Sequence, residues 1–158
     1  MLKYVDTLVG FSEVPDEISL CINISGCKNN CKGCHSSYLK KDVGQPLTKT
    51  AVYKLIEENK GITCVCFMGG EQNPLDLIDC LHIVHQLGLK TCLYSGVDSI
   101  NYIVAIGISS LCDYIKVGHY DERLGGLNSL TTNQKFFSRI DGHLVDTTYK
   151  FQKGYRND

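Results

Sequence analysis

Residues 17–35 read EISLCINISGCKNNCKGCH, and this stretch joins a strand-like run to a loop with three cysteines. An isoleucine or leucine stands at every second position from 18 to 24, which is typical of a half-buried β-strand. The spacing of Cys27, Cys31 and Cys34 is CxxxCxxC, so one short loop carries three thiolates. Three thiolates can hold three corners of a [4Fe–4S] cluster, whereas an electron-transfer cluster usually has four cysteine ligands. One iron would then stay open to a substrate or cofactor.

The rest of the chain predicts alternating helices and strands. The expected order after the cysteine loop is a helix from Thr48 or Thr50 to about 60, a strand at 62–68, a helix from Pro74 to about 88, a strand at 89–94, a helix at 97–110 and a strand at 113–117. Gly107 weakens the third helix. Repeated strand–helix units predict a parallel sheet with right-handed crossovers.

The length of 158 residues limits the architecture. A full eight-unit barrel takes about 250 residues, so we expect an α/β fold with a partial, open parallel barrel. No linker or repeat divides the chain, which predicts one domain over residues 1–158 with a core at about 15–137. The C-terminal residues 142–158 could form an edge strand or a flexible docking tail.

The candidate motifs all follow predicted strands. Ligands of such sheets bind at the carboxyl ends of the strands. The cysteine loop follows the first strand, Gly69-Gly70-Glu71 follows the second, and Ser95-Gly96 follows the third. Gly118-His119 follows the fourth strand, and His119 could lie either in the cleft or on the surface. A Gly-Gly turn allows close approach of a ligand to the backbone, although a plain connector is an equal alternative.

Composition argues against several classes of partner. Sixteen basic and 17 acidic side chains nearly balance, so nothing predicts a nucleic-acid or anionic-membrane partner. No signal peptide and no apolar run of about 20 residues is apparent, and we expect a cytoplasmic protein. Lysines at 28, 32, 40 and 41 form either a solvated rim or a patch for an acidic redox donor.

Nine cysteines in a chain of this kind suggest metal ligands and buried thiols rather than disulfides. Six of them are expected as small core residues: Cys21, Cys64, Cys66, Cys80, Cys92 and Cys112. A structural zinc site with Cys27, Cys31, Cys34 and His35 is the main alternative to a cluster. The adjacent Cys34 and His35 would be strained as ligands of one ion, and no second CxxC pair completes the site.

The order of CxxxCxxC and Gly-Gly-Glu resembles the radical SAM superfamily. The resemblance implies that Cys27, Cys31 and Cys34 hold a [4Fe–4S] cluster whose open iron chelates S-adenosylmethionine. It implies that Gly69, Gly70 and Glu71 line the methionyl amino group. Weaker candidates for the nucleoside side are Tyr94, Ser95 and Gly96. Many members have an aromatic residue before the third cysteine, where this chain has Gly33, so adenine would need another contact, such as the backbone or His35.

Two further segments resemble the anaerobic ribonucleoside-triphosphate reductase activating proteins. They are residues 44–48, GQPLT, and residues 125–134, GGLNSLTTNQ. The likeness covers about residues 15–137. The sequence differs from these proteins at His119, where proline is expected. It also differs at Gln72-Asn73, which place a longer segment between Glu71 and Pro74.

This second resemblance implies an activating enzyme. Its cluster, reduced by a flavodoxin or ferredoxin, would cleave S-adenosylmethionine to a 5′-deoxyadenosyl radical. The radical would generate a glycyl radical on the reductase. Alternatives are another radical SAM enzyme, either a formate-lyase type activase or a small-molecule enzyme, and a non-enzymatic iron–sulfur or zinc module.

Overall fold

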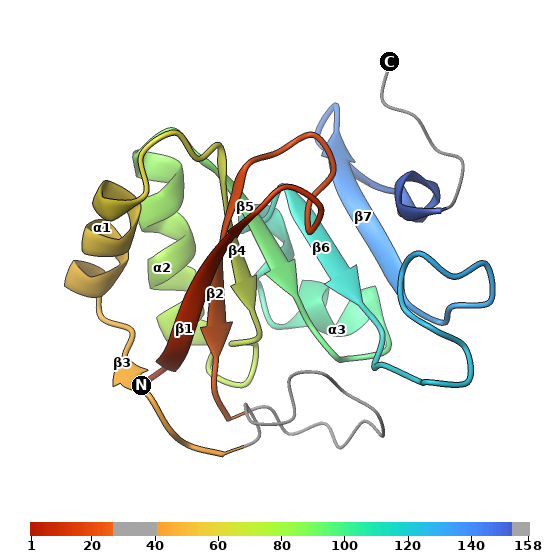
Figure 1. Ribbon diagram of the computed structural model, residues 1–158, viewed down its shortest axis with the longest axis horizontal. Coiled ribbons are helices and arrows are strands. Elements are labelled where there is room, and N and C mark those ends of the chain that lie inside the picture. Colours follow the sequence, from red (N-terminus) through yellow and green to blue (C-terminus); the bar gives the residue numbers. More distant parts are fainter. Residues whose placement is uncertain (27–40, 153–158) are drawn as a thin grey trace.

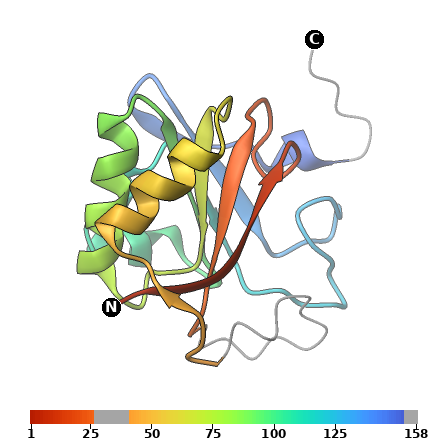
Figure 2. The ribbon, with the colours of Figure 1, turned by 60° about the vertical axis from the view of Figure 1, so that its left-hand side comes forward.

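A computed structural model describes residues 1–26 and 41–152 of the chain. Its centre is one mixed eight-stranded sheet with the order β3-β1-β2-β4-β5-β6-β7-β8, and the helices lie against one face (Figures 1 and 2). The strands are β1 (Lys3–Gly10), β2 (Ser19–Ile24), β3 (Gln45–Pro46), β4 (Cys64–Met68), β5 (Lys90–Tyr94), β6 (Tyr114–Val117), β7 (Lys135–Ile140) and β8 (His143–Asp146).

The four strands expected from the sequence form the parallel centre of the sheet. Strand β2 pairs with β4, β4 with β5 and β5 with β6, all in parallel. The carboxyl ends of these strands therefore share one edge, which we call the carboxyl edge. Strands β1, β3, β7 and β8 add to the two sides of this centre in antiparallel pairs. Closure into a partial barrel stays a prediction.

Two of the expected helices match their sequence signals. Helix α1 (Lys49–Glu58) begins after Thr48, whose hydroxyl accepts a hydrogen bond from the Ala51 amide. Helix α2 (Pro74–Gln86) has its proline in the first turn, where the missing N–H costs nothing. Among the described residues, no helix is long and apolar enough to cross a membrane.

The helix predicted at 97–110 is wrong in extent. Helix α3 covers only Ile100–Ala105, and a 3₁₀ turn follows at Ser109–Leu111. Gly107 has φ +81°, a left-handed conformation that ends an α-helix rather than continuing it. The glycine that weakened the helix in the sequence therefore terminates it.

The helix face of the sheet carries the main apolar core. Alternate residues of each central strand point to this face, because side chains of a strand alternate between its two sides. Leu20, Phe67, Leu93 and Ile115 are fully buried there against the helices. Burial of such side chains contributes roughly 1.5–3 kcal/mol each, so this layer dominates the stability of the fold.

The opposite face, which we call the loop face, carries a row of thiols. Cys21, Cys66 and Cys92 lie in register on neighbouring strands β2, β4 and β5. The three are buried, and Val14 and Phe136 pack in the same cluster. The six cysteines with described positions are free and buried, which confirms that they are small core residues.

The sheet ends in a hairpin that the sequence left undecided. Strands β7 and β8 are joined at Asp141 and Gly142, which have φ values of +51° and +82°. Positive φ at both central residues is the geometry of a tight two-residue hairpin turn. A 3₁₀ turn at Thr148–Phe151 then returns to the loop face, where Phe151 packs against Phe136 at 4.9 Å between ring centroids.

Candidate functional site

The carboxyl edge brings together the described motifs that follow strands β4, β5 and β6. Strand β2 ends at Ile24 and leads through Ser25 and Gly26 to the cysteine loop. The predicted ligands Cys27, Cys31 and Cys34, together with His35, lie outside the described residues. The other predicted residues, at positions 69–71 and 94–96, follow or end the neighbouring strands β4 and β5.

The Gly69-Gly70-Glu71 segment forms a tight turn at the end of β4. Gly69 and Gly70 have φ values of +102° and +108°, which side chains other than glycine rarely adopt. A Cβ on Gly70 would lie 3.1 Å from Cδ1 of Ile24. The Asn73 amide donates to the Gly70 carbonyl at 3.1 Å, which closes the turn and begins helix α2. Both glycines are therefore required by the backbone, and we call residues 69–73 the Gly-Gly-Glu turn.

Glu71 carries an acceptor without a partner. Its Oε2 atom is buried and has no hydrogen-bond partner among the described residues. A buried carboxylate oxygen without a donor is costly, because folding has removed the water that would have satisfied it. A ligand with an ammonium group or another N–H donor at this edge would supply the missing hydrogen bond.

Tyr94 faces the loop face, at the end of strand β5. Its hydroxyl donates to the backbone carbonyl of Glu13, and its ring meets the ring of Phe136 edge-on at 6.2 Å. Burial raises the pKa of Tyr94 well above its ordinary value, so the hydroxyl stays protonated. Tyr94, which the sequence predicts to contact the nucleoside, thus holds the β1–β2 connection against the sheet through its hydroxyl.

Ser95 and Gly96 continue the edge after Tyr94. Ser95 is buried, its amide donates to the Lys116 carbonyl at 2.9 Å, and its hydroxyl accepts from the Val97 amide at 3.2 Å. Gly96 is half-buried beside it. These contacts shape a polar backbone turn, and the Ser95 hydroxyl stabilises that turn.

Lys116 places a positive charge at the same edge. Its Nζ donates to the Gly118 carbonyl at 2.8 Å and the Ser95 carbonyl at 3.3 Å, and it lies 5.9 Å from the centre of the Tyr94 ring. The ammonium therefore ties the ends of β5 and β6 together. A cation fixed in this way also favours an anionic group of a ligand nearby.

His119 follows β6 and pairs with Asp98. The Nδ1 atom of His119 lies 2.6 Å from Oδ1 of Asp98, and the His119 amide donates to the same oxygen at 3.1 Å. The side-chain hydrogen bond from His119 is the main cause that lowers the pKa of Asp98. Both side chains are exposed in part, so the pair sits on the rim of the edge.

The distinctive Gly-rich segment forms a closed loop between β6 and β7. Gln134 Nε2 donates to the Gly118 carbonyl at 3.4 Å and Asn133 Nδ2 donates to the His119 carbonyl at 3.1 Å, so the two ends meet. Leu127 is buried in the loop-face cluster, whereas Leu130 is 87% exposed. The loop thus packs on the sheet through Leu127 and presents Leu130 outward.

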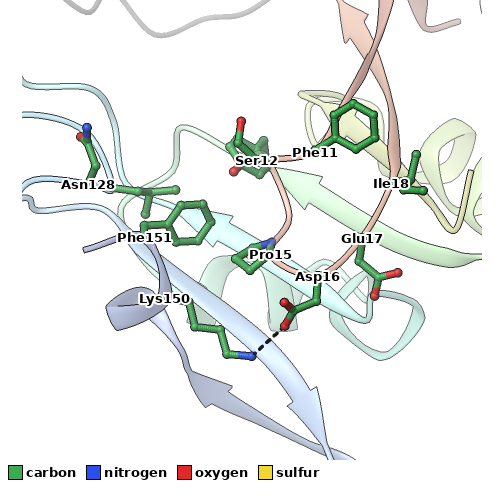
Figure 3. Close-up of a pocket in the computed structure, with 11 residues that line it drawn as sticks. Phe11, Ser12, Pro15, Asp16, Glu17, Ile18, Asn128, Lys150 and Phe151 are labelled. Carbon is green, nitrogen blue, oxygen red and sulfur yellow. Dashed lines mark ion pairs between the residues drawn. The ribbon is translucent and has the colours of Figure 1, made fainter. Parts of the chain in front are cut away.

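A pocket of about 850 Å³ opens on the loop face (Figure 3). Its walls come from the β1–β2 connection on one side and from the C-terminal 3₁₀ turn and the Gly-rich loop on the other. An ion pair between Lys150 and Asp16, 3.5 Å apart, joins the two walls. The lining residues are Phe11, Ser12, Pro15, Asp16, Glu17, Ile18, Tyr94, Leu127, Asn128, Lys150 and Phe151.

The buried thiols do not form a second metal centre in the described part of the chain. No group of three His, Cys, Asp or Glu residues in positions 1–26 and 41–152 could hold a metal ion. Burial raises the pKa of Cys64 to about 12 and that of Cys92 to about 11, so these thiols stay protonated. Cys64 and Cys66 are fully buried in the sheet.

The comparisons with known proteins identify the cofactor class. A family model for a 4Fe-4S single cluster domain matches residues 18–124, about two thirds of the chain. The match includes all three cysteines of the CxxxCxxC loop and the whole parallel centre of the sheet. The protein is an iron–sulfur protein, and it belongs to the 4Fe-4S single cluster domain family. No curated protein matches the chain, and no solved structure matches it.

Two residues of the edge were not found as site candidates from the sequence. Lys116 lies within a strand, and only the pairing of β5 with β6 shows that its ammonium reaches the Ser95 carbonyl. Asp98 looks like an ordinary polar residue before a helix. A signal was available for Lys116, because a lysine in an otherwise apolar four-residue strand is rarely buried without a partner.

Proposed function

We propose that this protein is a radical SAM activating enzyme. It would use a [4Fe–4S] cluster on Cys27, Cys31 and Cys34 and bind S-adenosylmethionine at the carboxyl edge. The observation that carries this proposal is the unpartnered buried oxygen of Glu71, at the strand end next to the strand that leads into the cysteine loop. Membership of the 4Fe–4S family supports the cluster itself.

Each residue of the edge has a task in this proposal. Glu71 accepts a hydrogen bond from the methionyl ammonium of S-adenosylmethionine, and Gly69 and Gly70 let the ligand approach the backbone. Lys116 adds positive charge near the methionyl carboxylate, and the polar turn at Ser95-Gly96 contacts the nucleoside. A reduced cluster held by Cys27, Cys31 and Cys34 would supply one electron, which would break the sulfonium C–S bond and give methionine and a 5′-deoxyadenosyl radical. That radical would take a hydrogen atom from a glycine of the target, which would leave 5′-deoxyadenosine and a glycyl radical.

The proposed target is a backbone glycine of the anaerobic ribonucleoside-triphosphate reductase. The support is the resemblance of residues 44–48 and 125–134 to the activating proteins of that enzyme. In the structure, residues 125–134 lie in the loop that follows β6 at the carboxyl edge, on the side of the β7 strand. A flavodoxin or ferredoxin is the proposed electron donor.

One experiment tests the activity and then the target. The cluster is reconstituted under anaerobic conditions, and dithionite and S-adenosylmethionine are added. We expect 5′-deoxyadenosine by chromatography, and with the reductase a glycyl radical signal by electron paramagnetic resonance. A fully loaded protein that forms no 5′-deoxyadenosine would show that it is an electron-transfer or metal-binding module instead. Cleavage without a radical on the reductase would contradict only the target and would favour another radical SAM reaction.

A further inference from the structure

The residue pair Gln72-Asn73 has a defined place in the Gly-Gly-Glu turn. These two residues separate Glu71 from Pro74 and lengthen the approach to helix α2. The Asn73 amide closes the turn on the Gly70 carbonyl, which puts Glu71 and Gln72 at its two central positions. The added length is therefore used to build a turn, and Gln72 projects from its tip.

The side chain of Gln72 bridges two strand ends. Its Oε1 accepts a hydrogen bond from the Gly70 amide at 3.2 Å, and its Nε2 donates to the Ser25 carbonyl at 3.2 Å. Ser25 follows strand β2, and Gly70 follows strand β4. Only one orientation of the amide satisfies both contacts, because Gly70 offers an N–H and Ser25 a carbonyl oxygen.

The bridge connects the residues that lead into the cysteine loop with the turn that carries Glu71. Ser25 is two residues before Cys27, and Glu71 adjoins Gln72 in the chain. A Cβ on Gly26 would lie 3.5 Å from Nε2 of Gln72, so the amide also packs over the start of that loop. This side chain therefore adds a direct polar link between the Gly-Gly-Glu turn and the end of β2, beyond the β2–β4 pairing that already joins the two strands.

We propose that Gln72 is a positioning residue for the ligand of the carboxyl edge. It holds the Gly-Gly-Glu turn against the end of β2, so that the free oxygen of Glu71 faces the group bound there. This inference rests on the proposed function, because the ligand it invokes is S-adenosylmethionine. Gln72 itself is exposed, so its replacement leaves no cavity in the core.

The hydrogen bond between the Gly70 amide and Gln72 can be observed by NMR in the protein without its cluster and without an activity assay. The chain has only two Gly-Gly pairs, at 69–70 and 125–126. Labelling glycine with ¹³C at the carbonyl and ¹⁵N at the amide therefore leaves two amides, those of Gly70 and Gly126, that follow a labelled carbonyl. In the metal-free protein we expect Gln72→Leu to shift the Gly70 amide upfield and speed its hydrogen exchange, with the Gly126 amide unchanged.

Binding to the loaded protein tests the consequence. Wild type, Gln72→Leu, Gln72→Glu and the control Gln86→Leu, which alters an exposed glutamine at the other end of α2, are matched for iron and sulfide content. We expect Gln72→Leu to weaken S-adenosylmethionine binding about ten-fold, as the loss of one or two hydrogen bonds implies. Gln72→Glu keeps the acceptor for Gly70 but loses the donor to Ser25, so its Gly70 amide stays near the wild-type position and its affinity falls as in Gln72→Leu.

These measurements distinguish a failure of this inference from a failure of the proposed function. Wild-type affinity in Gln72→Leu or in Gln72→Glu would overturn the inference, as would an unchanged Gly70 amide in Gln72→Leu. A wild-type protein that carries the full cluster and binds no S-adenosylmethionine would overturn the proposed function. In that case the amide spectrum would still show whether Gln72 bridges the two strand ends.

Discussion

At the scale of single residues, the proposed binding of S-adenosylmethionine depends most on the Oε2 oxygen of Glu71. It is buried at a strand end and has no donor among the described side chains and amides. Its neighbours Gly69 and Gly70 have no side chains to cover it. A carboxylate in this position gains most from a cationic donor, since hydrogen bonds to charged groups are worth about 1.5–3 kcal/mol.

We expect Glu71→Gln to weaken S-adenosylmethionine binding about 10- to 100-fold, because the charge that attracts the ammonium is lost. Isothermal titration of the loaded protein measures the affinity, and the cluster content is measured beside it. Glu57→Gln, on the exposed side of α1, is the matched control and should bind as wild type does. Unchanged affinity in Glu71→Gln would remove this residue from the ligand site.

The pair of Asp98 and His119 predicts a pH effect with a definite sign. The hydrogen bonds from His119 lower the pKa of Asp98 below its ordinary value of 3.8. A carboxyl with a lowered pKa stabilises the folded state above the ordinary value, and this contribution is lost as the pH falls through the lowered value. Because Asp98 is largely exposed, the contribution to stability is small.

An NMR titration of the Asp98 carboxyl should therefore give a midpoint below 3.8. In His119→Leu the midpoint should rise part of the way, because the backbone amide of residue 119 still donates to the same oxygen. His143→Leu, which alters a histidine in strand β8, should leave it unchanged. A midpoint that is the same in wild type and His119→Leu would show that the pair does not form in solution.

Elements differ in how well the sequence predicted them, and the differences have physical causes. Strands β2, β4, β5 and β6 were predicted because they are buried and apolar, and Thr48 and Pro74 mark the starts of α1 and α2. Strand β1 was not predicted. It lies toward the side of the sheet, its side chains are half-exposed, and its pairing with β2 and β3 makes it a strand.

The β7–β8 hairpin has a local signal in the sequence. Asp141-Gly142 stands between two runs that contain apolar residues, which is a strong short-range hairpin pattern. The candidate site was predictable from the sequence only in part. Its Gly-Gly-Glu turn could be found from the sequence, whereas the contacts of Lys116 and Gln72 depend on which strands become neighbours.

The geometry of the β7–β8 turn predicts that a side chain at Gly142 would destabilise the fold through the backbone conformation and not through a steric clash. Gly142 has φ +82°, and a Cβ built there would meet no atom within 4 Å. We expect Gly142→Ala to lower the free energy of unfolding by about 1–2 kcal/mol through the left-handed backbone alone. Gly126→Ala is the control, because its backbone is not left-handed and its Cβ would lie 3.7 Å from the nearest atom. Urea denaturation measures both, and an equal cost for the two variants would contradict the turn geometry.

At the scale of the whole molecule, the nine cysteines fall into two groups, six in the described part of the chain and three in the CxxxCxxC loop. Six free thiols lie in the cores on the two faces of the sheet, and burial raises the pKa of Cys64, Cys80 and Cys112 to about 12. The thiolate is the form that reacts with alkylating agents, so a buried thiol that stays protonated is inert. The other three cysteines form the CxxxCxxC loop that the proposal assigns to the cluster.

This separation predicts the pattern of alkylation. Under anaerobic native conditions, iodoacetamide should leave Cys21, Cys64, Cys66, Cys80, Cys92 and Cys112 unmodified, with or without the cluster. Cluster loading should therefore change the labelling of Cys27, Cys31 and Cys34 alone, as peptide mass spectrometry can show. Unfolding in urea is the control and should make all nine cysteines reactive. Protection by the cluster of any of the six core thiols would place a ligand inside the sheet, and it would contradict both the three-cysteine assignment and the open iron on which S-adenosylmethionine binding depends.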